Sequence, residues 1–145
     1  MPVTDDQVAA LRALLRDDMD RHRQLFAGLD RAEARKGYPA LVTAAFIEAV
    51  ERRFGTGSQP ADIVAFVADI RTRSDRLASR LDPDVSERVI QSVLGDGTVR
   101  GLDKEAVTSA KLLLLAGLIA DARLDDAGLD EFLAAARKLA DQLMS

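Results

Sequence analysis

Apolar residues recur at spacings of three and four along most of this chain, and this period predicts amphipathic α-helices. No stretch alternates apolar and polar residues well enough to predict a strand. Six helical stretches follow from the pattern, and a break in the long first one is expected near Gly28. The first begins behind Thr4 or Asp5 as its N-cap and runs to Leu29. The others are expected from Tyr38 to Phe54, from after Ser58 to Leu77 or Leu81, from Pro83 to Leu94, over roughly 104–122, and from Asp125 or Asp126 to Leu143.

Residues at the ends of these stretches support the bounds. Thr4 and Asp82 are good N-caps, because their side-chain oxygens accept hydrogen bonds from the free N–H groups of a first helical turn. Pro39 suits a first turn, where its missing N–H is not needed. The glycine-rich connection at 95–101 follows a helix, so we interpret Gly95 as the residue after a helix end and not as part of a phosphate loop.

A run without charge, from Leu112 to Ala120, stands between Lys111 and Asp121. At about 1.5 Å of rise per residue it is too short to cross a bilayer, and it is apolar on every side. Such a helix belongs in the middle of a globular core. The chain is therefore predicted to be all-α, a single compact domain over residues 1–145 with about six helices around this central helix, in a bundle-like or orthogonal arrangement.

Composition narrows the functional classes. Apolar residues make up 48% of the 145 residues and charged residues 30%, the balance of a globular protein that needs no metal or other cofactor to fold. The chain has no cysteine, which excludes disulfides, cysteine-based zinc sites and thiol nucleophiles. The net charge of −4 disfavours nucleic acid and anionic membranes as partners. The N-terminal residues lack the pattern of a signal peptide, so we expect a cytoplasmic protein, with the alanine and arginine usage of GC-rich bacteria.

The single histidine, His22, is the first candidate for chemistry. It lies on the same stripe as Met19 and Phe26, and Asp18 lies one helical turn before it. One interpretation is a general base that Asp18 orients, or a metal ligand beside neighbouring aspartates. The simpler interpretation, which we prefer, is a half-buried imidazole bonded to a neighbouring carboxylate. One histidine cannot supply the Glu-x-x-His motifs of a di-iron bundle.

Glu48 and Glu51 form a Glu-x-x-Glu pair on one helical face, which resembles half of the magnesium site of all-α nucleotide pyrophosphohydrolases. Such a site needs paired carboxylates on a facing helix to hold the cation over the phosphates. The next predicted helix offers Asp62 and Asp69, and neither has a second carboxylate three residues on. The hypothesis is a magnesium-dependent hydrolase of phosphorylated small molecules. Its alternative is a solvated face in which Glu48 pairs with Arg52.

The segment from Leu112 to Phe132 resembles the helical hairpin of tellurite-resistance (TerB-like) domains. That family usually has Asp-Gly where this chain has Asp121-Ala122-Arg123, so membership is not inferred. Asp125, Asp126 and Asp130 also fail the ligand pattern of an EF-hand, because Phe132 replaces its bidentate glutamate. We interpret the three aspartates as an N-cap and first-turn carboxylates, which the helix dipole stabilises.

Arg73, Arg76 and Arg80 share one face of the third predicted helix. Arginines in this arrangement can form paired hydrogen bonds with phosphates or carboxylates, so the face is a candidate surface for nucleic acid or an acidic partner. Asp69 lies one turn before Arg73 and dilutes the charge. The net charge of −4 and the absence of lysine from this face disfavour nucleic acid as its partner.

Every chemical motif in the chain lacks a member, so we favour a noncatalytic helical protein-interaction or regulatory module. Ile47 and Val64 lie outside the main apolar stripes of the second and third predicted helices, and they are the expected interface of a homodimer. The alternatives are the magnesium-dependent hydrolase and the arginine-face regulator. The sequence names no small-molecule ligand.

Overall fold

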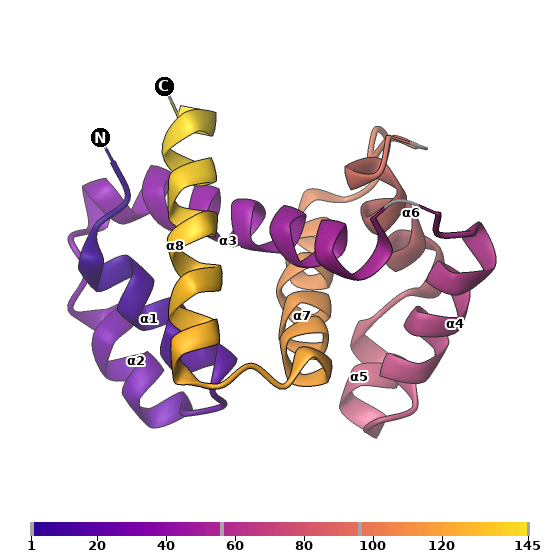
Figure 1. Ribbon diagram of the computed structural model, residues 1–145, viewed down its shortest axis with the longest axis horizontal. Coiled ribbons are helices and arrows are strands. Elements are labelled where there is room, and N and C mark those ends of the chain that lie inside the picture. Colours follow the sequence, from indigo (N-terminus) through magenta and orange to yellow (C-terminus); the bar gives the residue numbers. More distant parts are fainter. Residues whose placement is uncertain (1, 56, 96, 145) are drawn as a thin grey trace. The chain divides into compact units, whose positions relative to one another are not determined.

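The computed structural model describes residues 2–55, 57–95 and 97–144 (Figure 1). Within these residues the protein is all-helical, as predicted, with eight helices where about six were expected and no strand. Thr56 and Asp96, in the two glycine-rich connections, lie outside the described residues. The helices are α1 (Asp5–Leu15), α2 (Met19–Ala27), α3 (Arg31–Phe54), α4 (Pro60–Arg71), α5 (Asp75–Arg80), α6 (Pro83–Val93), α7 (Lys104–Ala122) and α8 (Asp126–Met144).

Contacts divide the chain into two compact units. The first contains the residues up to Glu48 and those from Ile119 on, and the second contains Ala49–Leu118. Both α3 and α7 therefore contribute residues to each unit. The expectation of one folded domain over residues 1–145 stays a prediction.

Three of the helices begin at N-caps that the sequence predicts. The side-chain oxygens of Thr4, Asp82 and Asp125 each accept a hydrogen bond from the backbone N–H three residues on, at 3.2, 3.3 and 2.7 Å. Each cap satisfies an N–H group that has no partner within its own helix. At Thr4 the motif is a full capping box, because the side chain of Gln7 accepts from the Thr4 N–H in return.

The first predicted helix is in fact two helices, so the expectation of one helix as far as Leu29 was wrong. Asp17 adopts the left-handed conformation, with φ of 59°. The N–H groups of Asp17 and Asp18 then bond back to the carbonyls of Leu14 and Ala13, at 3.0 and 2.9 Å. This pair of bonds is a Schellman ending, and it stops α1 at Leu15. The break expected near Gly28 is also present, because α2 ends at Ala27 with Gly28 as its C-cap.

Helix α3 begins at Arg31, about two turns before the expected start at Tyr38. The prediction placed Pro39 in the first turn, but Pro39 lies inside the helix. The end at Phe54 is as predicted. The extra N-terminal turns bring Arg31 and Arg35 onto the helix, and this matters for the site described below.

In the first unit, α1 and α8 pack against each other in antiparallel directions (Figure 1). At one end, the Arg137 guanidinium donates to the Val3 carbonyl at 2.7 Å and pairs with Asp5. At the other end, Arg12 pairs with Asp130. The large buried side chains of this unit are Leu11, Leu41, Phe46, Leu129, Phe132 and Leu133.

In the second unit, the third predicted helix is divided into α4 and α5, which is a second correction. The Ser74 hydroxyl caps α5 by accepting from the Leu77 N–H at 3.0 Å. Arg71 then closes the corner, because its guanidinium donates to the carbonyls of Leu81 at 2.8 Å and Ala78 at 3.0 Å. The buried side chains here include Phe54, Ile63, Phe66, Val67, Ile70, Leu81 and Ile90.

The uncharged run in α7 is buried over part of its circumference only. Ala120 is exposed, and the remaining residues of the run are half-buried except Leu114, Leu115, Leu118 and Ile119, which are buried. A Cβ atom at Gly117 would overlap the Cδ1 atom of Ile70, so the missing side chain lets α7 approach α4 closely. Within the described residues, no helix is long and apolar enough to span a membrane.

Candidate binding surfaces

A hollow of about 480 Å³ lies at the turn from α2 into α3, within the first unit. Among the described residues it is lined by four apolar side chains and two arginines: Phe26, Ala27, Leu29, Ala34, Arg31 and Arg35. Phe26 is 47% exposed, which is unusual for a large aromatic side chain. The hollow is thus an apolar surface with a cationic rim.

Aromatic rings form one wall of this region. The rings of His22 and Phe26, one turn apart on α2, have centroids 5.6 Å apart. The Phe26 ring meets the Tyr38 ring of α3 edge to face, at 5.2 Å and 76°. Edge-to-face pairs stabilise packing beyond the area they bury. Phe26 is therefore held in a fixed position although nearly half of it faces solvent.

The two arginines stand one turn apart at the start of α3. Like charges at this spacing repel, and the N-terminal end of a helix is the end at which cations are disfavoured. Among the described residues no carboxylate pairs with Arg31 or Arg35. The nearby carboxylate of Asp30 caps the helix instead, accepting from the Glu33 N–H at 3.0 Å. The charges of Arg31 and Arg35 therefore do not stabilise the fold through an ion pair within the described residues.

The hydroxyl of Tyr38 is fully buried and has no hydrogen-bond partner among the described residues. Burial disfavours the ionised phenolate and raises the pKa of Tyr38 to about 12. Burial of this hydroxyl costs desolvation free energy that no hydrogen bond within the described residues offsets.

His22 lies in this region, but the structure does not assemble the catalytic arrangement that the sequence suggests for it. The ring Nδ1 is 2.8 Å from the Ala10 carbonyl, which can only accept, so Nδ1 donates. The Asp18 carboxylate instead caps α2 by accepting from the Arg21 N–H at 3.3 Å. His22 is half-buried, as expected, and its partner is a backbone carbonyl where a carboxylate was predicted.

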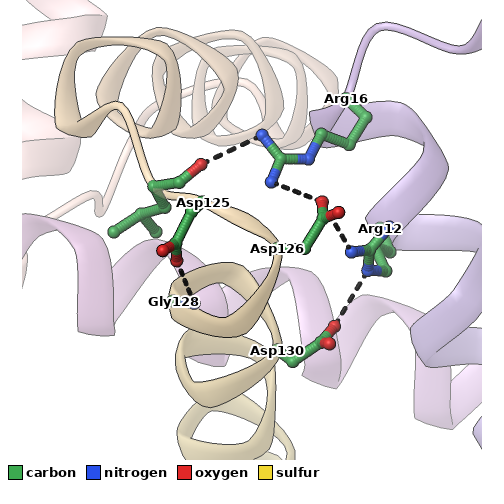
Figure 2. Close-up of polar contacts among 7 residues, drawn as sticks. Arg12, Arg16, Asp125, Asp126, Gly128 and Asp130 are labelled. Carbon is green, nitrogen blue, oxygen red and sulfur yellow. Dashed lines mark hydrogen bonds and ion pairs between the residues drawn. The ribbon is translucent and has the colours of Figure 1, made fainter.

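Two aspartates of α8, Asp126 and Asp130, bind arginines at the C-terminal end of α1 (Figure 2). Asp126 accepts from Arg12 at 3.2 Å and from Arg16 at 3.0 Å, and Asp130 accepts from Arg12 at 2.9 Å. The hydrogen bond to Asp130 raises the pKa of Arg12 above its usual value. Asp125 caps α8 and Asp126 lies in its first turn, as interpreted from the sequence, whereas Asp130 lies one turn further along the helix. The carboxylates of Asp126 and Asp130 hold α8 against α1.

The proposed metal ligands are engaged in other interactions. The Asp62 carboxylate accepts from the Gln59 N–H at 2.9 Å, and Asp69 pairs with Arg73 at 2.7 Å. Both aspartates line a hollow of about 360 Å³ that also contains Arg53, a cation stacked 5.3 Å from the Phe66 ring centroid. Among the described residues, no group of three metal-ligating side chains could hold an ion.

The other two proposed metal ligands, Glu48 and Glu51, lie on α3, where Glu48 is half-buried and Glu51 is exposed.

Lys111 is a half-buried residue of α7 that the sequence pattern did not indicate as a site residue, and burial lowers its pKa. It lines none of the hollows described above.

The arginine face is not formed in the way the sequence suggests. Because α4 ends at Arg71, Arg73 lies in the turn before α5, whereas Arg76 and Arg80 lie on α5. Arg73 is paired with Asp69. Arg76 and Arg80 are exposed and one turn apart.

The two predicted interface residues differ in accessibility. Ile47 on α3 is half-buried, whereas Val64 on α4 is 46% exposed. Val64 belongs to a continuous exposed face of apolar residues at helical spacing, which we call the α4 face: Ala61, Val64, Ala65 and Ala68. No charged side chain interrupts these four positions.

No protein family, curated protein or solved structure was found to match this chain. The sequence pattern indicates the α4 face in part, through Val64, and gives no indication of the hollow at the turn from α2 into α3. Phe26 was assigned to a core stripe, and Arg31 and Arg35 fell outside every expected helix. The spacing of the two arginines was the available signal.

Proposed function

We propose that this chain is a noncatalytic helical interaction module that associates with a second copy of itself through the α4 face. The observation that carries the proposal is the exposure of four apolar residues at positions i, i+3, i+4 and i+7 of one helix, with Val64 at 46%. Side chains at these positions line one side of a helix. Apolar faces of this kind are usually buried against another surface.

The α4 face is suited to a two-fold partner. Its positions are symmetric about the midpoint between Val64 and Ala65. In an antiparallel pair, Ala61 would meet Ala68 of the second copy, and Val64 would meet Ala65. A two-fold interface requires this self-complementarity. Three alanines also allow the helix backbones to come close, which increases dispersion contacts.

Two of the proposed ligands of the alternative hydrolase, Asp62 and Asp69, already have partners. This favours an interaction role over metal-dependent hydrolysis. One helix face is small for an interface, so we expect a dissociation constant in the micromolar range.

Sedimentation velocity over a range of concentrations tests the proposal. Wild-type protein is expected to dimerise. Val64→Glu should weaken the dimer by at least about a hundredfold, because the symmetric contact would bury two carboxylates without partners. Leu143→Glu is the matched control, since Leu143 is 53% exposed on α8 and lies outside the proposed interface. Circular dichroism checks that all three proteins are folded. A monomeric wild type, or a dimer that Val64→Glu leaves intact, would overturn the proposal.

A further inference from the structure

The hollow at the turn from α2 into α3 has the size and chemistry of a small-ligand site. We infer that it binds a small aliphatic carboxylate, with the tail against Phe26 and Leu29 and the head group on Arg31 and Arg35. This surface is separate from the α4 face, so the inference and the proposed function can fail independently.

The lining favours an apolar tail. Four of the six described lining residues are apolar, and the volume of about 480 Å³ falls within the range of small-molecule sites. Phe26 provides a large ring surface, and its contacts with His22 and Tyr38 hold that ring in place before any ligand arrives. A wall that is already ordered costs little conformational entropy on binding.

The rim favours an anionic head group. Arg31 and Arg35 line the hollow one turn apart, and no acidic side chain is among the described lining residues. Their mutual repulsion would be relieved by an anion placed between them. Guanidinium groups form paired hydrogen bonds with the two oxygens of a carboxylate. Charge and geometry therefore complement a ligand with one carboxylate at the end of an apolar chain.

A carboxylate fits better than a phosphate ester. A head group that binds here must lose part of its hydration beside an apolar wall. That cost rises steeply with charge, so a monoanion is favoured over a dianion.

Octanoate is a suitable probe, used below the concentration at which it forms micelles. In a titration of the full ¹⁵N-labelled chain followed by heteronuclear NMR, saturable shifts are expected at the backbone amides of residues 27–35. Octanol has the same tail without the charge, and octyl phosphate carries a different head group. Both should bind at least about tenfold more weakly, the loss expected when charge-assisted hydrogen bonds are not formed or desolvation is larger.

The variants separate head-group recognition from general charge. Arg31→Gln with Arg35→Gln should weaken octanoate binding about tenfold or more. Arg76→Gln with Arg80→Gln removes the same charge at the same spacing from the exposed surface of α5, and should leave binding unchanged. All four arginines are exposed, so both proteins are expected to fold. Phe26→Ala should weaken octanoate and octanol alike.

Several results would overturn the inference. These are shifts that do not saturate, shifts centred outside residues 27–35, equal affinity for octanol, tighter binding of octyl phosphate, or equal losses in the two arginine pairs. Each of them would show that the hollow does not select an aliphatic carboxylate.

Discussion

The buried hydroxyl of Tyr38 allows a sharp test of the packing between α2 and α3. Burial raises its pKa from the ordinary value of 10 to about 12. Between these two pH values the unfolded chain loses the phenolic proton while the folded chain keeps it, so stability falls as pH rises. Below pH 10 both states are protonated and the full stability is present. A shift of this size corresponds to about 2 to 3 kcal/mol of unfolding free energy, lost by the time the pH reaches the folded pKa and above.

The assay can be specific to this residue, because the chain has one tyrosine and no tryptophan. The near-ultraviolet absorbance of tyrosinate in an alkaline titration therefore reports Tyr38 alone, and its midpoint is expected near pH 12. Denaturant unfolding followed by circular dichroism gives the stability at each pH. Tyr38→Phe is the control, because the difference between the two proteins removes the contribution of lysines that titrate in the same range.

At neutral pH, Tyr38→Phe should leave stability unchanged or raise it by up to about 1 kcal/mol, since the hydroxyl has no partner among the described residues to lose. This expectation is unusual for removal of a buried polar group. A titration midpoint near pH 10 would show that the ring is exposed. A loss of more than about 1 kcal/mol in Tyr38→Phe would show that the hydroxyl is hydrogen-bonded. Either result refutes the reasoning.

Two backbone substitutions are expected to act in opposite directions in thermal or denaturant unfolding. Asp17→Gly should stabilise by up to about 1 kcal/mol, because glycine adopts the left-handed conformation at φ of 59° without strain, whereas Asp17→Ala should give no gain. Gly117→Ala should destabilise, because overlap with Ile70 costs about 1–3 kcal/mol and outweighs the gain in helix propensity. Gly28→Ala, at a position with space for a methyl group, is the control for Gly117→Ala.

The sequence predicts best those helix starts that have a side-chain cap. Thr4, Asp82 and Asp125 act as caps through a bond to the third following residue, and such a local interaction can be predicted from the side chain alone. The missed end of α1 has Asp17 where glycine usually marks the left-handed residue. The α7 helix is also followed by a left-handed residue that is not glycine, Arg123, although its end at Ala122 is as predicted. At Asp17, where the apolar period continues past the turn and no glycine is present, the local sequence gives no signal for a helix end.

The predicted start of α3 was wrong for a different reason, which is the position of Pro39. Pro39 lacks an N–H group, so it is best placed in a first turn, and this preference predicts a helix that begins at Tyr38. In the structure the helix continues through Pro39 and starts at Arg31. Proline inside a helix loses one hydrogen bond and strains the preceding turn, so tertiary packing must compensate for the loss. Packing of this kind is not visible in a local pattern.

The wrong bounds predicted for the first helix and for α3 explain why the sequence did not indicate the hollow, whereas it indicated part of the α4 face. Val64 is separated from the apolar stripe of a single helix, so periodicity alone marks it as exposed. The hollow instead depends on where α2 ends and α3 begins. A helix that continues to Leu29 places Phe26 in a core stripe, and a helix that starts at Tyr38 leaves Arg31 and Arg35 in a loop. Only the observed bounds bring an exposed aromatic ring and two uncompensated charges around one cavity, so a functional surface made by a turn depends on the helix ends that sequence patterns predict least well.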